Sequence, residues 1–417
     1  MKLRVNGGAK LCGEHKVQGA KNSILPILSA CVLCKGEVLL HNCPALSDVE
    51  SALKILNHLG FETKRDGSDI YIKCSSVSCC AVPEKLMREM RSSIVFLGAI
   101  LSSAGCAEIS MPGGCELGPR PIDIHIAALK KLGAEINDNH GVLSCRVFGR
   151  MKGTQIDLWF PSVGATENII LAAAMAEGTT VITNAACEPE IADLAAFLNS
   201  CGAKISGAGS SRIVIEGVDE LCGCEHSIMP DRIATVTFLT AAAITKGDVT
   251  LVGTNKEDIT ASLSLLEQAG CNIKYYDDCI SLGMKARPKP ISVIKTLPHP
   301  GFPTDAQAPV MALMTLSSGT TMFVETIFQN RFRHAYELYK MGADIKTEGK
   351  VAVVNGVERL KHSAVSATDL RGGAALLVAA LSAEGESVID CVEHIDRGYQ
   401  HIEDDLRLLG ADVVREK

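Results

Sequence analysis

The chain has 417 residues, of which 47% are hydrophobic and 21% charged, and its formal net charge is −7. This composition is typical of a folded globular protein rather than a disordered or fibrous one, and the length predicts two or three domains. The negative charge argues against a nucleic-acid partner, because phosphate backbones are bound by accumulated cations, so an anionic ligand would need a local cationic cluster.

The first residues, MKLRVNGGAK, contain no apolar signal-peptide core. The longest uncharged run, residues 306–324, is interrupted by SSGTT and does not predict a membrane span. We therefore expect a cytoplasmic protein with no membrane insertion.

The 17 cysteines are odd in number and scattered, and no export signal accompanies them, which favours reduced thiols over disulfides. The most metal-like arrangement is Cys31-x-x-Cys34, followed by His41 and Cys43. It lies where an apolar helix is predicted to run into a strand, and no second pair stands at a zinc-ribbon spacing. Small buried cysteines on a core helix are favoured over a zinc site.

Two series of glycines recur along the chain at intervals of 66 to 73 residues. The first, in motifs such as HLGFETK and KLGAEIN, comprises Gly60, Gly133, Gly202, Gly270, Gly342 and Gly410. The second, in motifs such as KGEVLL and AGCAEI, comprises Gly36, Gly105, Gly178, Gly247, Gly319 and Gly385. Because the two series are in phase, they predict six copies of one unit of about 70 residues.

Each copy shows the same order of predicted elements. It begins with a stretch such as IILAAAMAEG, apolar on every side, which predicts a helix buried all round. A glycine suited to a helix C-cap follows, and then a short β-branched strand. A second helix, as in SDVESALKILNHLG, has apolar residues three and four apart and a charged outer face, so it is half exposed. Two or three further strands complete the unit.

The ends of the chain are out of phase with this unit. Residues 1–20 look like its final strands with no helix before them, and the last copy stops after LLGADVVREK without those strands. We expect the N-terminus to complete the sixth unit. Two groups of three units then give one domain over residues 21–229 and a second over 1–20 plus 230–417, with a ligand cleft between them.

Polar residues recur in phase with the repeat. Fourteen residues before the second glycine series stand Asn22, Arg91, Gly164, Ile233, Asp305 and Arg371, near the starts of the buried helices. Twelve residues after it stand Asp48, Leu117, Glu190, Ile259, Arg331 and Arg397, with Cys115 and Glu188 two residues earlier on the same loops. In each copy the buried helix leads away from the first set, and the strand after it leads back over a similar distance to the second set. Both sets are therefore predicted to face the same end of a domain.

Helix N-termini at that end would add partial positive charge to Lys21, Arg120 and the phased arginines. We therefore expect a strongly cationic cleft for a ligand with several negative charges. Alternatively, each arginine forms an ordinary surface ion pair, and Asn22 and Asp305 are helix caps.

The chain resembles the enolpyruvyl transferases over essentially its whole length, most closely those whose acceptor is UDP-N-acetylglucosamine. The resemblance rests on the motifs QGAKNSILPIL, MRSSIVFLGA, MPGGCELGPRPIDIHI, SVGAT, AACEPEI, PDRIATVTFL, PGFPTDAQAP, ETIFQNRF, ATDLRGGAAL and HIDRGYQHIEDDLRLLGA.

This resemblance implies an α/β fold of two inside-out α/β barrel domains, each of three repeated helix–strand units. It also implies transfer of the enolpyruvyl group of phosphoenolpyruvate to the 3-hydroxyl of UDP-N-acetylglucosamine with release of phosphate. That reaction is the first committed step of peptidoglycan synthesis. No metal, organic cofactor or obligatory protein partner is expected.

The same resemblance assigns the site residues. Cys115, Asp305 and Asp369 are the expected catalytic residues. Phosphoenolpyruvate is expected to contact Lys21, Asn22, Arg120, Arg331, Arg371 and Arg397. UDP-N-acetylglucosamine is expected to contact Arg91, Arg120, Pro121, Ile122, Asp123, Ile124, His125, Ser162, Val163, Gly164, Asp305 and Ile327. One departure is Phe160, because many relatives carry a lysine two residues before that serine, so the diphosphate lacks a cation here.

Addition to phosphoenolpyruvate needs a proton on the methylene carbon and loss of the acceptor's hydroxyl proton. The resemblance assigns the first to Cys115 and the second to Asp305. A helix N-terminus and nearby arginines favour the ionised Asp305, so we expect it mainly to orient the hydroxyl. Arg120 favours the Cys115 thiolate whereas donation needs the thiol, which a closing glycine-rich loop would reconcile. Family members with cysteine here are inactivated by the epoxide fosfomycin.

Two alternatives stay open. One is the shikimate-pathway enzyme of the same fold, whose acceptor is shikimate 3-phosphate. The other is a non-catalytic repeat protein that binds an anion or a partner, which predicts similar residues in all six copies. The phased positions instead differ as Asn, Arg, Gly, Ile, Asp and Arg, which favours an asymmetric active site.

Overall fold

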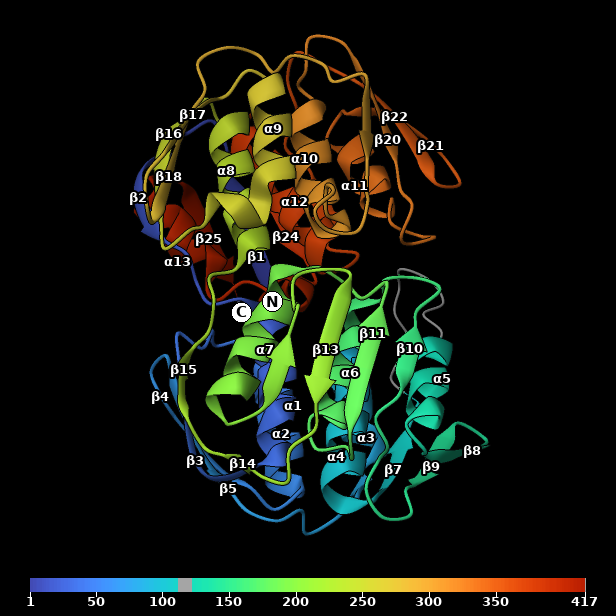
Figure 1. The fold of residues 1–417 in the computed structure, drawn as a ribbon. Helices are drawn as coiled ribbons and strands as arrows, with labels where there is room; N and C mark the ends of the chain where they lie inside the picture. Colours follow the sequence, from blue (N-terminus) through green and yellow to red (C-terminus); the bar gives the residue numbers. More distant parts are fainter. Residues whose placement is uncertain (112–121, 417) are drawn as a thin grey trace. The chain divides into compact units, whose positions relative to one another are not determined.

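The computed structural model describes residues 1–111 and 122–416 (Figure 1). The chain folds into two compact units. Unit 1 contains residues 1–18 and the chain from Pro230 onward, and unit 2 contains the described residues between Gly19 and Met229.

Unit 2 repeats one arrangement three times. Its buried helices are α1 (Lys21–Ala30), α4 (Phe96–Ala104) and α6 (Val163–Ala173). The strands that follow are β3 (Cys34–His41), β7 (Cys106–Ser110) and β11 (Thr179–Thr183), and the half-exposed helices are α2 (Ser47–His58), α5 (Asp123–Lys131) and α7 (Pro189–Ser200). The remaining strands are β4 (Glu62–Asp66), β5 (Asp69–Cys74), β6 (Ala81–Val82), β8 (Glu135–Asn139), β9 (Val142–Arg146), β10 (Gln155–Asp157), β12 (Lys204–Ser206), β13 (Arg212–Glu216), β14 (Leu221–Cys222) and β15 (Glu225–Ser227). Short helices are η1 (Cys31–Leu33), α3 (Glu84–Glu89) and η2 (Arg91–Val95).

Unit 1 uses the same order of elements. Its buried helices are α8 (Arg232–Ile244), α10 (Thr304–Met314) and α12 (Leu370–Ser382). The strands that follow are β16 (Asp248–Val252), β20 (Thr320–Val324) and β24 (Glu386–Asp390). The second helices are α9 (Thr260–Gln268), α11 (His334–Lys340) and α13 (Ile402–Leu408). Short helices precede two of them, η3 (Lys256–Ile259) before α9 and η4 (Val392–Arg397) before α13. The remaining strands are β1 (Lys2–Asn6), β2 (Cys12–Lys16), β17 (Asn272–Tyr275), β18 (Cys279–Gly283), β19 (Val293–Lys295), β21 (Asp344–Glu348), β22 (Val351–Asn355), β23 (Ala364–Ser366) and β25 (Asp412–Glu416).

The sheets share one topology. The strand that follows each buried helix pairs parallel with an edge strand on one side and antiparallel with a third strand on the other, as in the order β10-β11-β13-β12. The N-terminal strands enter two sheets of unit 1. β1 lies between β24 and β25, with Val5 opposite Ser387 and Val413, and β2 runs parallel to β16.

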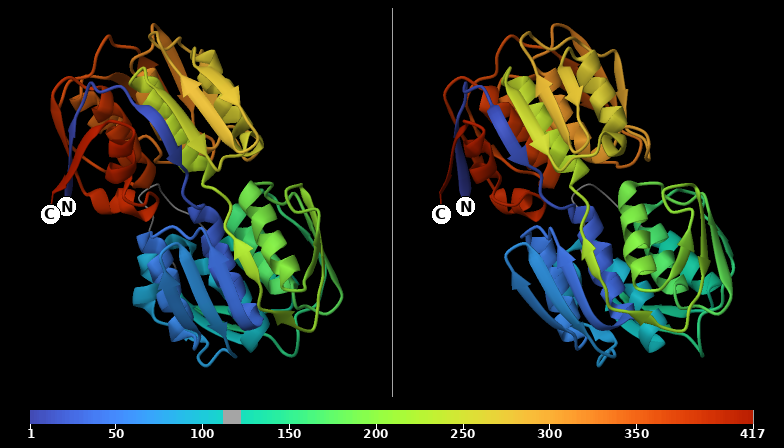
Figure 2. Two further views of the ribbon diagram at one scale, coloured as in Figure 1. Left: turned by 90° about the vertical axis from the view of Figure 1, so that its left-hand side faces the viewer. Right: turned by 60° about the vertical axis from the view of Figure 1, so that its left-hand side comes forward.

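Each unit has its buried helices inside and its sheets outside (Figure 2). Every one of the 13 residues of α8 is buried, and α8, α10 and α12 pack against one another, because helices without a polar face must be covered on all sides. Gly105 ends α4 in the left-handed conformation expected of a C-cap glycine. The inside-out α/β fold predicted from the sequence is confirmed.

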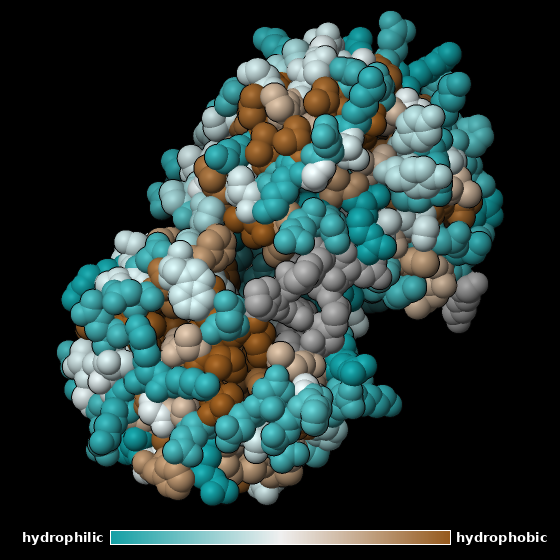
Figure 3. Space-filling model, turned by 90° about the vertical axis from the view of Figure 1, so that its right-hand side faces the viewer, coloured by the Kyte–Doolittle hydropathy of each residue, from teal (hydrophilic) through white to brown (hydrophobic). Residues whose placement is uncertain are grey.

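The sheets turn their polar faces outward. Figure 3 shows hydrophilic side chains over much of the face in view, with apolar side chains in smaller patches. Among the described residues, no helix combines the length and the apolar character needed to cross a membrane.

The four residues considered as zinc ligands are not brought together. The Cys31 thiol donates to Ile27 O in the core of unit 2, and the Cys34 sulfur lies 3.6 Å from that of Cys201. His41 faces the carboxylates of Asp69 and Glu225 instead. The buried-core interpretation therefore describes these cysteines.

Helices α4 and α6 approach each other closely at Gly98. Its backbone N–H donates to Asn168 Oδ1 at 2.6 Å, and Asn168 Nδ2 donates to Ile94 O at 2.9 Å. A Cβ at position 98 would clash with the side-chain and backbone oxygens of Asn168. The glycine is therefore required by packing.

Gly98→Ala is expected to destabilise the protein by about 1 to 3 kcal/mol, because overpacking forces these two helices apart. Urea unfolding followed by circular dichroism measures the change. Ser103→Ala, at an exposed position of the same helix, is the control and should change stability by less than about 0.5 kcal/mol. Equal stability of the two variants would contradict the packing argument.

Candidate active site

In unit 1, one carboxylate holds two buried guanidinium groups. Asp305 lies in the first turn of α10, Arg371 in the first turn of α12, and Arg331 on the segment between β20 and α11. Arg371 Nε and Nη2 donate to Asp305 Oδ2 at 3.3 and 3.2 Å, and Arg331 Nη2 donates to Asp305 Oδ1 at 3.0 Å. Both arginine side chains are only 2% exposed. Each oxygen of Asp305 thus orients one buried cation.

Asp369 ties the same group to the start of α12. Its Oδ1 accepts from the backbone N–H groups of Arg371 and Gly372 at 3.1 and 3.0 Å, and it lies 3.7 Å from Arg331 Nη1. Burial alone would raise the pKa of Asp369, but the Arg331 charge and the Gly372 N–H outweigh burial and lower it. Asp369 is therefore ionised and caps the helix that carries Arg371.

Arg371 retains an unused donor. Its Nη1 is buried and has no hydrogen-bond partner within the described residues. Burial opposes the charge of this guanidinium, but Tyr399 and the nearby carboxylates of Asp305 and Asp231 keep its pKa above the ordinary value. A buried, charged donor without a partner is costly, and a bound anion would satisfy it.

His334 was not predicted from the sequence. It is the first residue of α11, it is fully buried, and neither ring nitrogen has a hydrogen-bond partner in the described part of the chain. Burial lowers the pKa of His334 to about 4, even though the Asp369 charge opposes this shift. The ring is therefore neutral and adds no charge beside Arg331 and Asp369.

In unit 2, Lys21 and Asp48 form a buried ion pair. Lys21 Nζ lies 2.7 Å from Asp48 Oδ2, and both side chains are almost fully covered. Lys21 begins α1, and Asp48 lies in the first turn of α2. The starts of the buried helices and the segments after the returning strands are predicted to lie at the same end of a unit. The Lys21–Asp48 and Asp305–Arg331 ion pairs confirm this.

The structure also brings together two predicted nucleotide segments in unit 2. Ser162 caps α6 by accepting from Ala165 N–H, and a Cβ on Gly164 would lie 3.2 Å from the His125 ring of α5. Asn168 Nδ2 donates to His125 Nδ1 at 3.0 Å, which leaves the hydrogen of the neutral ring on Nε2. Residues 122–125 and 162–164 therefore share one corner of the unit.

A second residue missed by sequence reasoning, Glu167, lies on α6 one turn beyond these residues. It is buried, and burial together with the charges of Glu190 and Glu188 raises its pKa well above the ordinary value. Both causes disfavour the ionised carboxylate at Glu167. In the sequence, Glu167 stands within an apolar stretch and outside the phased positions, so no pattern indicated a functional role for it.

Other predicted residues are placed only by their elements. Arg91 begins η2, Asn22 follows Lys21 in α1, Ile327 follows β20, and Arg397 ends η4. Cys115, Arg120 and Pro121 lie outside the described residues. The expected loop positions need correction: Asp48 and Glu190 lie in helix first turns and Ile259 in η3.

The charge balance differs from the strongly cationic expectation. Lys21 is paired with Asp48, Arg371 with Asp305, and Arg331 with both Asp305 and Asp369. Three of the predicted cations thus come with three carboxylates. The physical reason is that buried charges are tolerated only when paired.

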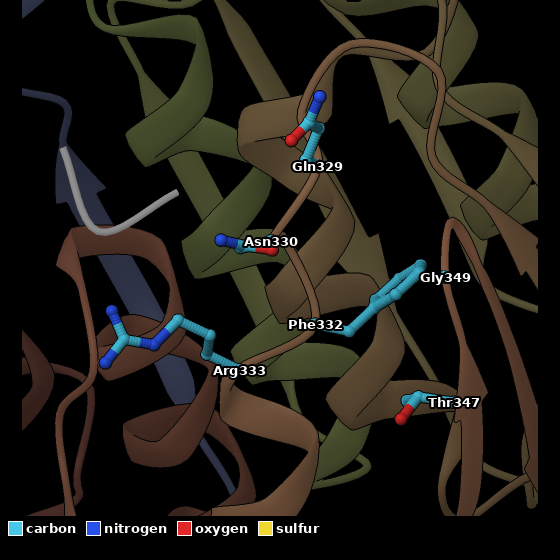
Figure 4. A pocket seen from close by; sticks show the side chains of 6 residues that line it. All are labelled: Gln329, Asn330, Phe332, Arg333, Thr347 and Gly349. Atoms are coloured by element: carbon cyan, nitrogen blue, oxygen red, sulfur yellow. The ribbon is translucent and has the colours of Figure 1, made fainter. Parts of the chain in front are cut away.

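A pocket of about 400 Å³ is lined by the segment after β20, including the neighbours of Arg331 in the sequence. Its lining residues are Gln329, Asn330, Phe332, Arg333, Thr347 and Gly349. In Figure 4 the Phe332 ring extends toward the β21–β22 turn at Gly349, and Arg333 extends away from it. None of these residues was predicted for the site.

Comparison with known proteins identifies the family. The family model of EPSP synthase (3-phosphoshikimate 1-carboxyvinyltransferase) matches residues 5–406. The chain belongs to the enolpyruvyl transferases. It is 50% identical over 414 residues to UDP-N-acetylglucosamine 1-carboxyvinyltransferase 2 of Caldanaerobacter subterraneus, with 99% of each chain covered. It is 48% identical over 417 residues to UDP-N-acetylglucosamine 1-carboxyvinyltransferase of Yersinia pestis, which covers 100% of this chain and 99% of the relative.

Solved enolpyruvyl transferase structures share the fold. NikO from Streptomyces tendae matches with a TM-score of 0.90 at 23% identity, covering 99% of this chain and 98% of that one. EPSP synthase from Acinetobacter baumannii matches with a TM-score of 0.73 at 18% identity, covering 99% and 100%. At these identities the likeness establishes the fold alone.

His334 makes the stability of this enolpyruvyl transferase depend on pH. Its pKa is about 4 in the folded state, whereas histidine in an unfolded chain titrates near 6.5. Between these values the unfolded chain binds a proton that the folded chain does not, so the free energy of unfolding should fall as pH falls from about 6.5 to about 4. His334→Gln should flatten this slope, leaving a contribution from His15, whose pKa burial also lowers.

Urea unfolding at several pH values between 4 and 8 measures the slope. His362→Gln is the control, because His362 is a histidine of the same unit whose side chain is exposed to water. If the wild type and His334→Gln lose stability equally on acidification, His334 is not the titrating group.

Proposed function

We propose that the chain transfers the enolpyruvyl group of phosphoenolpyruvate to the 3-hydroxyl of UDP-N-acetylglucosamine and releases phosphate, the first committed step of peptidoglycan synthesis. The observation that carries this proposal is the 46–50% identity, over essentially the full chain, to several proteins named for that activity. The paired arginines and the unused Arg371 donor in unit 1 support it, because the donor substrate is a small, multiply charged anion.

Phosphoenolpyruvate carries a phosphate and a carboxylate on a small frame, which arginine forks suit. We propose that it contacts Lys21, Asn22, Arg120, Arg331, Arg371 and Arg397. In this proposal Asp305 and Asp369 hold Arg331 and Arg371 in place before the substrate arrives. Such preorganised cations stabilise charge that moves during the reaction, because they need no reorganisation.

The reaction has two stages. In the addition, the acceptor oxygen bonds to C2 of phosphoenolpyruvate, the methylene carbon gains a proton, and the hydroxyl loses one. In the elimination, the methyl group gives up a proton and the C2–O bond to phosphate breaks, which restores the double bond. One acid and one base therefore act in turn. We assign proton donation to Cys115 and propose that Asp369 belongs to the same catalytic set.

Asp305 is proposed to receive the acceptor hydroxyl. Both of its oxygens already accept from guanidinium groups, which stabilises the carboxylate and weakens it as a base. We therefore assign it mainly to orientation of the hydroxyl. This refines the role that the resemblance gives it.

The nucleotide is proposed to bind unit 2 at residues 120–125 and 162–164, with Arg91, Asp305 and Ile327 nearer the sugar. A helix N-terminus such as that of α6 suits a diphosphate, because the first N–H groups of a helix have no acceptor within the helix. Phe160, two residues before Ser162, supplies no charge to such a ligand. A cytoplasmic location and independence from any protein partner stay predictions.

Phosphate release with two alternative acceptors tests the proposal. We expect release when phosphoenolpyruvate is combined with UDP-N-acetylglucosamine, and no release with shikimate 3-phosphate or without an acceptor. A malachite-green assay measures phosphate, and mass spectrometry identifies the enolpyruvyl ether. Release with shikimate 3-phosphate alone would assign the chain to the other branch of the family.

Cys115 is tested by alkylation and by substitution. Fosfomycin should add its mass at Cys115, and Cys115→Ser should lower turnover by about 100-fold or more, the usual contribution of general acid catalysis. Peptide mass spectrometry locates the label. Cys12→Ser and Cys222→Ser, which remove exposed thiols, are controls and should keep both turnover and labelling. Labelling at another cysteine, or full turnover of Cys115→Ser, would refute the assignment.

A further inference from the structure

Arg371 rests on an aromatic ring that the predicted site does not include. Its guanidinium carbon lies 5.4 Å from the centroid of the Tyr399 ring, and both side chains are only 2% exposed. A cation over an aromatic face is attracted by the ring quadrupole, most strongly where water is excluded. Burial raises the pKa of Tyr399, so the ring faces Arg371 as a neutral phenol.

The Tyr399 ring is itself held at its hydroxyl. Tyr399 Oη lies 2.8 Å from Thr237 Oγ1 of α8. The Thr237 hydroxyl donates to Ile233 O at 2.9 Å, which leaves the Tyr399 hydroxyl as the donor to Thr237. The phenol therefore links α8 to the guanidinium of α12.

The backbone on either side of Tyr399 is held as well. Gln18 Nε2 donates to Gly398 O at 3.1 Å, and Gln18 Oε1 accepts from Gln400 N–H at 2.8 Å. Tyr399 N–H donates to Ile395 O at 3.1 Å. Hydrogen bonds thus fix both the backbone of Tyr399 and the hydroxyl of its ring. A side chain that served only apolar packing would not need the hydroxyl contact.

This support matters because Asp305 alone does not fix the Arg371 guanidinium. Arg371 places its Nε and Nη2 edge on one oxygen of Asp305, and this contact by itself permits rotation about its hydrogen bonds, whereas the Tyr399 side chain interacts with the guanidinium as well. A ring against one face restricts the guanidinium plane. The orientation of the unpartnered Nη1 donor therefore depends on Tyr399.

We propose that Tyr399 is a positioning residue that sets the orientation of Arg371 toward phosphoenolpyruvate, with Thr237 as its anchor. The inference rests on the proposed function for the identity of the anion. It predicts that loss of the ring weakens use of phosphoenolpyruvate and spares use of the nucleotide, because Arg371 is assigned to the former.

Steady-state kinetics with each substrate varied in turn tests the proposal. Tyr399→Leu, which removes the ring, should lower kcat/KM for phosphoenolpyruvate about 10- to 30-fold, as expected for a desolvated cation–π contact. KM for UDP-N-acetylglucosamine should change by less than about two-fold, well below the tenfold that 1.4 kcal/mol produces. Tyr399→Phe and Thr237→Val each remove the hydroxyl anchor and keep the ring, so each should retain kcat/KM to within about three-fold of wild type.

Phe238→Leu separates positioning from stability. Phe238 is an equally buried aromatic residue of α8 that packs on His15 instead of Arg371. It should lower the thermal midpoint about as much as Tyr399→Leu and leave kcat/KM for phosphoenolpyruvate unchanged. Equal kinetic losses in Phe238→Leu and Tyr399→Leu, or unchanged kinetics in Tyr399→Leu, would overturn the proposal.

Calorimetric titration with phosphoenolpyruvate gives a second readout that needs no turnover. Its Kd should rise in Tyr399→Leu and return close to the wild-type value in Tyr399→Phe. If the wild type binds phosphoenolpyruvate but releases phosphate with neither acceptor, the proposed function fails while the Kd comparison still decides the role of Tyr399. An unchanged Kd in Tyr399→Leu overturns that role.

Discussion

The bridge from Asp305 to Arg331 and Arg371 is the constraint on which the rest of the site in unit 1 depends. The buried helices α10 and α12 have no polar face, so a charge at either N-terminus must find its partner there. Asp305 meets this need for two arginines at once, with one oxygen for each. Removal of that carboxylate would leave two buried cations with too few partners.

Pairing these charges changes how the site can act on an anion. An unpaired cluster of cations would attract the substrate from a distance, but the cations would repel one another and require an ordering step on binding. Paired arginines attract less strongly at long range but stand already oriented. The neutral His334 fits the same pattern, because burial lowers its pKa and so adds no further charge beside Arg331 and Asp369.

Much of the fold could be predicted because it is repeated. Two glycine series placed six buried helices, and α1, α6, α8, α10 and α12 begin within one residue of the phased positions. The site could be predicted less fully, because a residue's partner comes from a distant copy. Asp305 and Arg371 are 66 residues apart, and nothing at either position specifies the other. His334, Glu167 and Tyr399 lie outside the phased positions, so the repeat could not indicate them.

One phase of the repeat shows how a structural cap becomes part of a site. Ser162, Asp231 and Asp369 each stand two residues before a phased position, and each caps a buried helix by accepting from backbone N–H groups. In α8 and α12 the caps are nearly identical, with N–H donors at 2.9 to 3.1 Å. Asp369 differs by lying 3.7 Å from Arg331. The capping and functional interpretations of these residues are therefore compatible, because the carboxylate that caps α12 also faces Arg331.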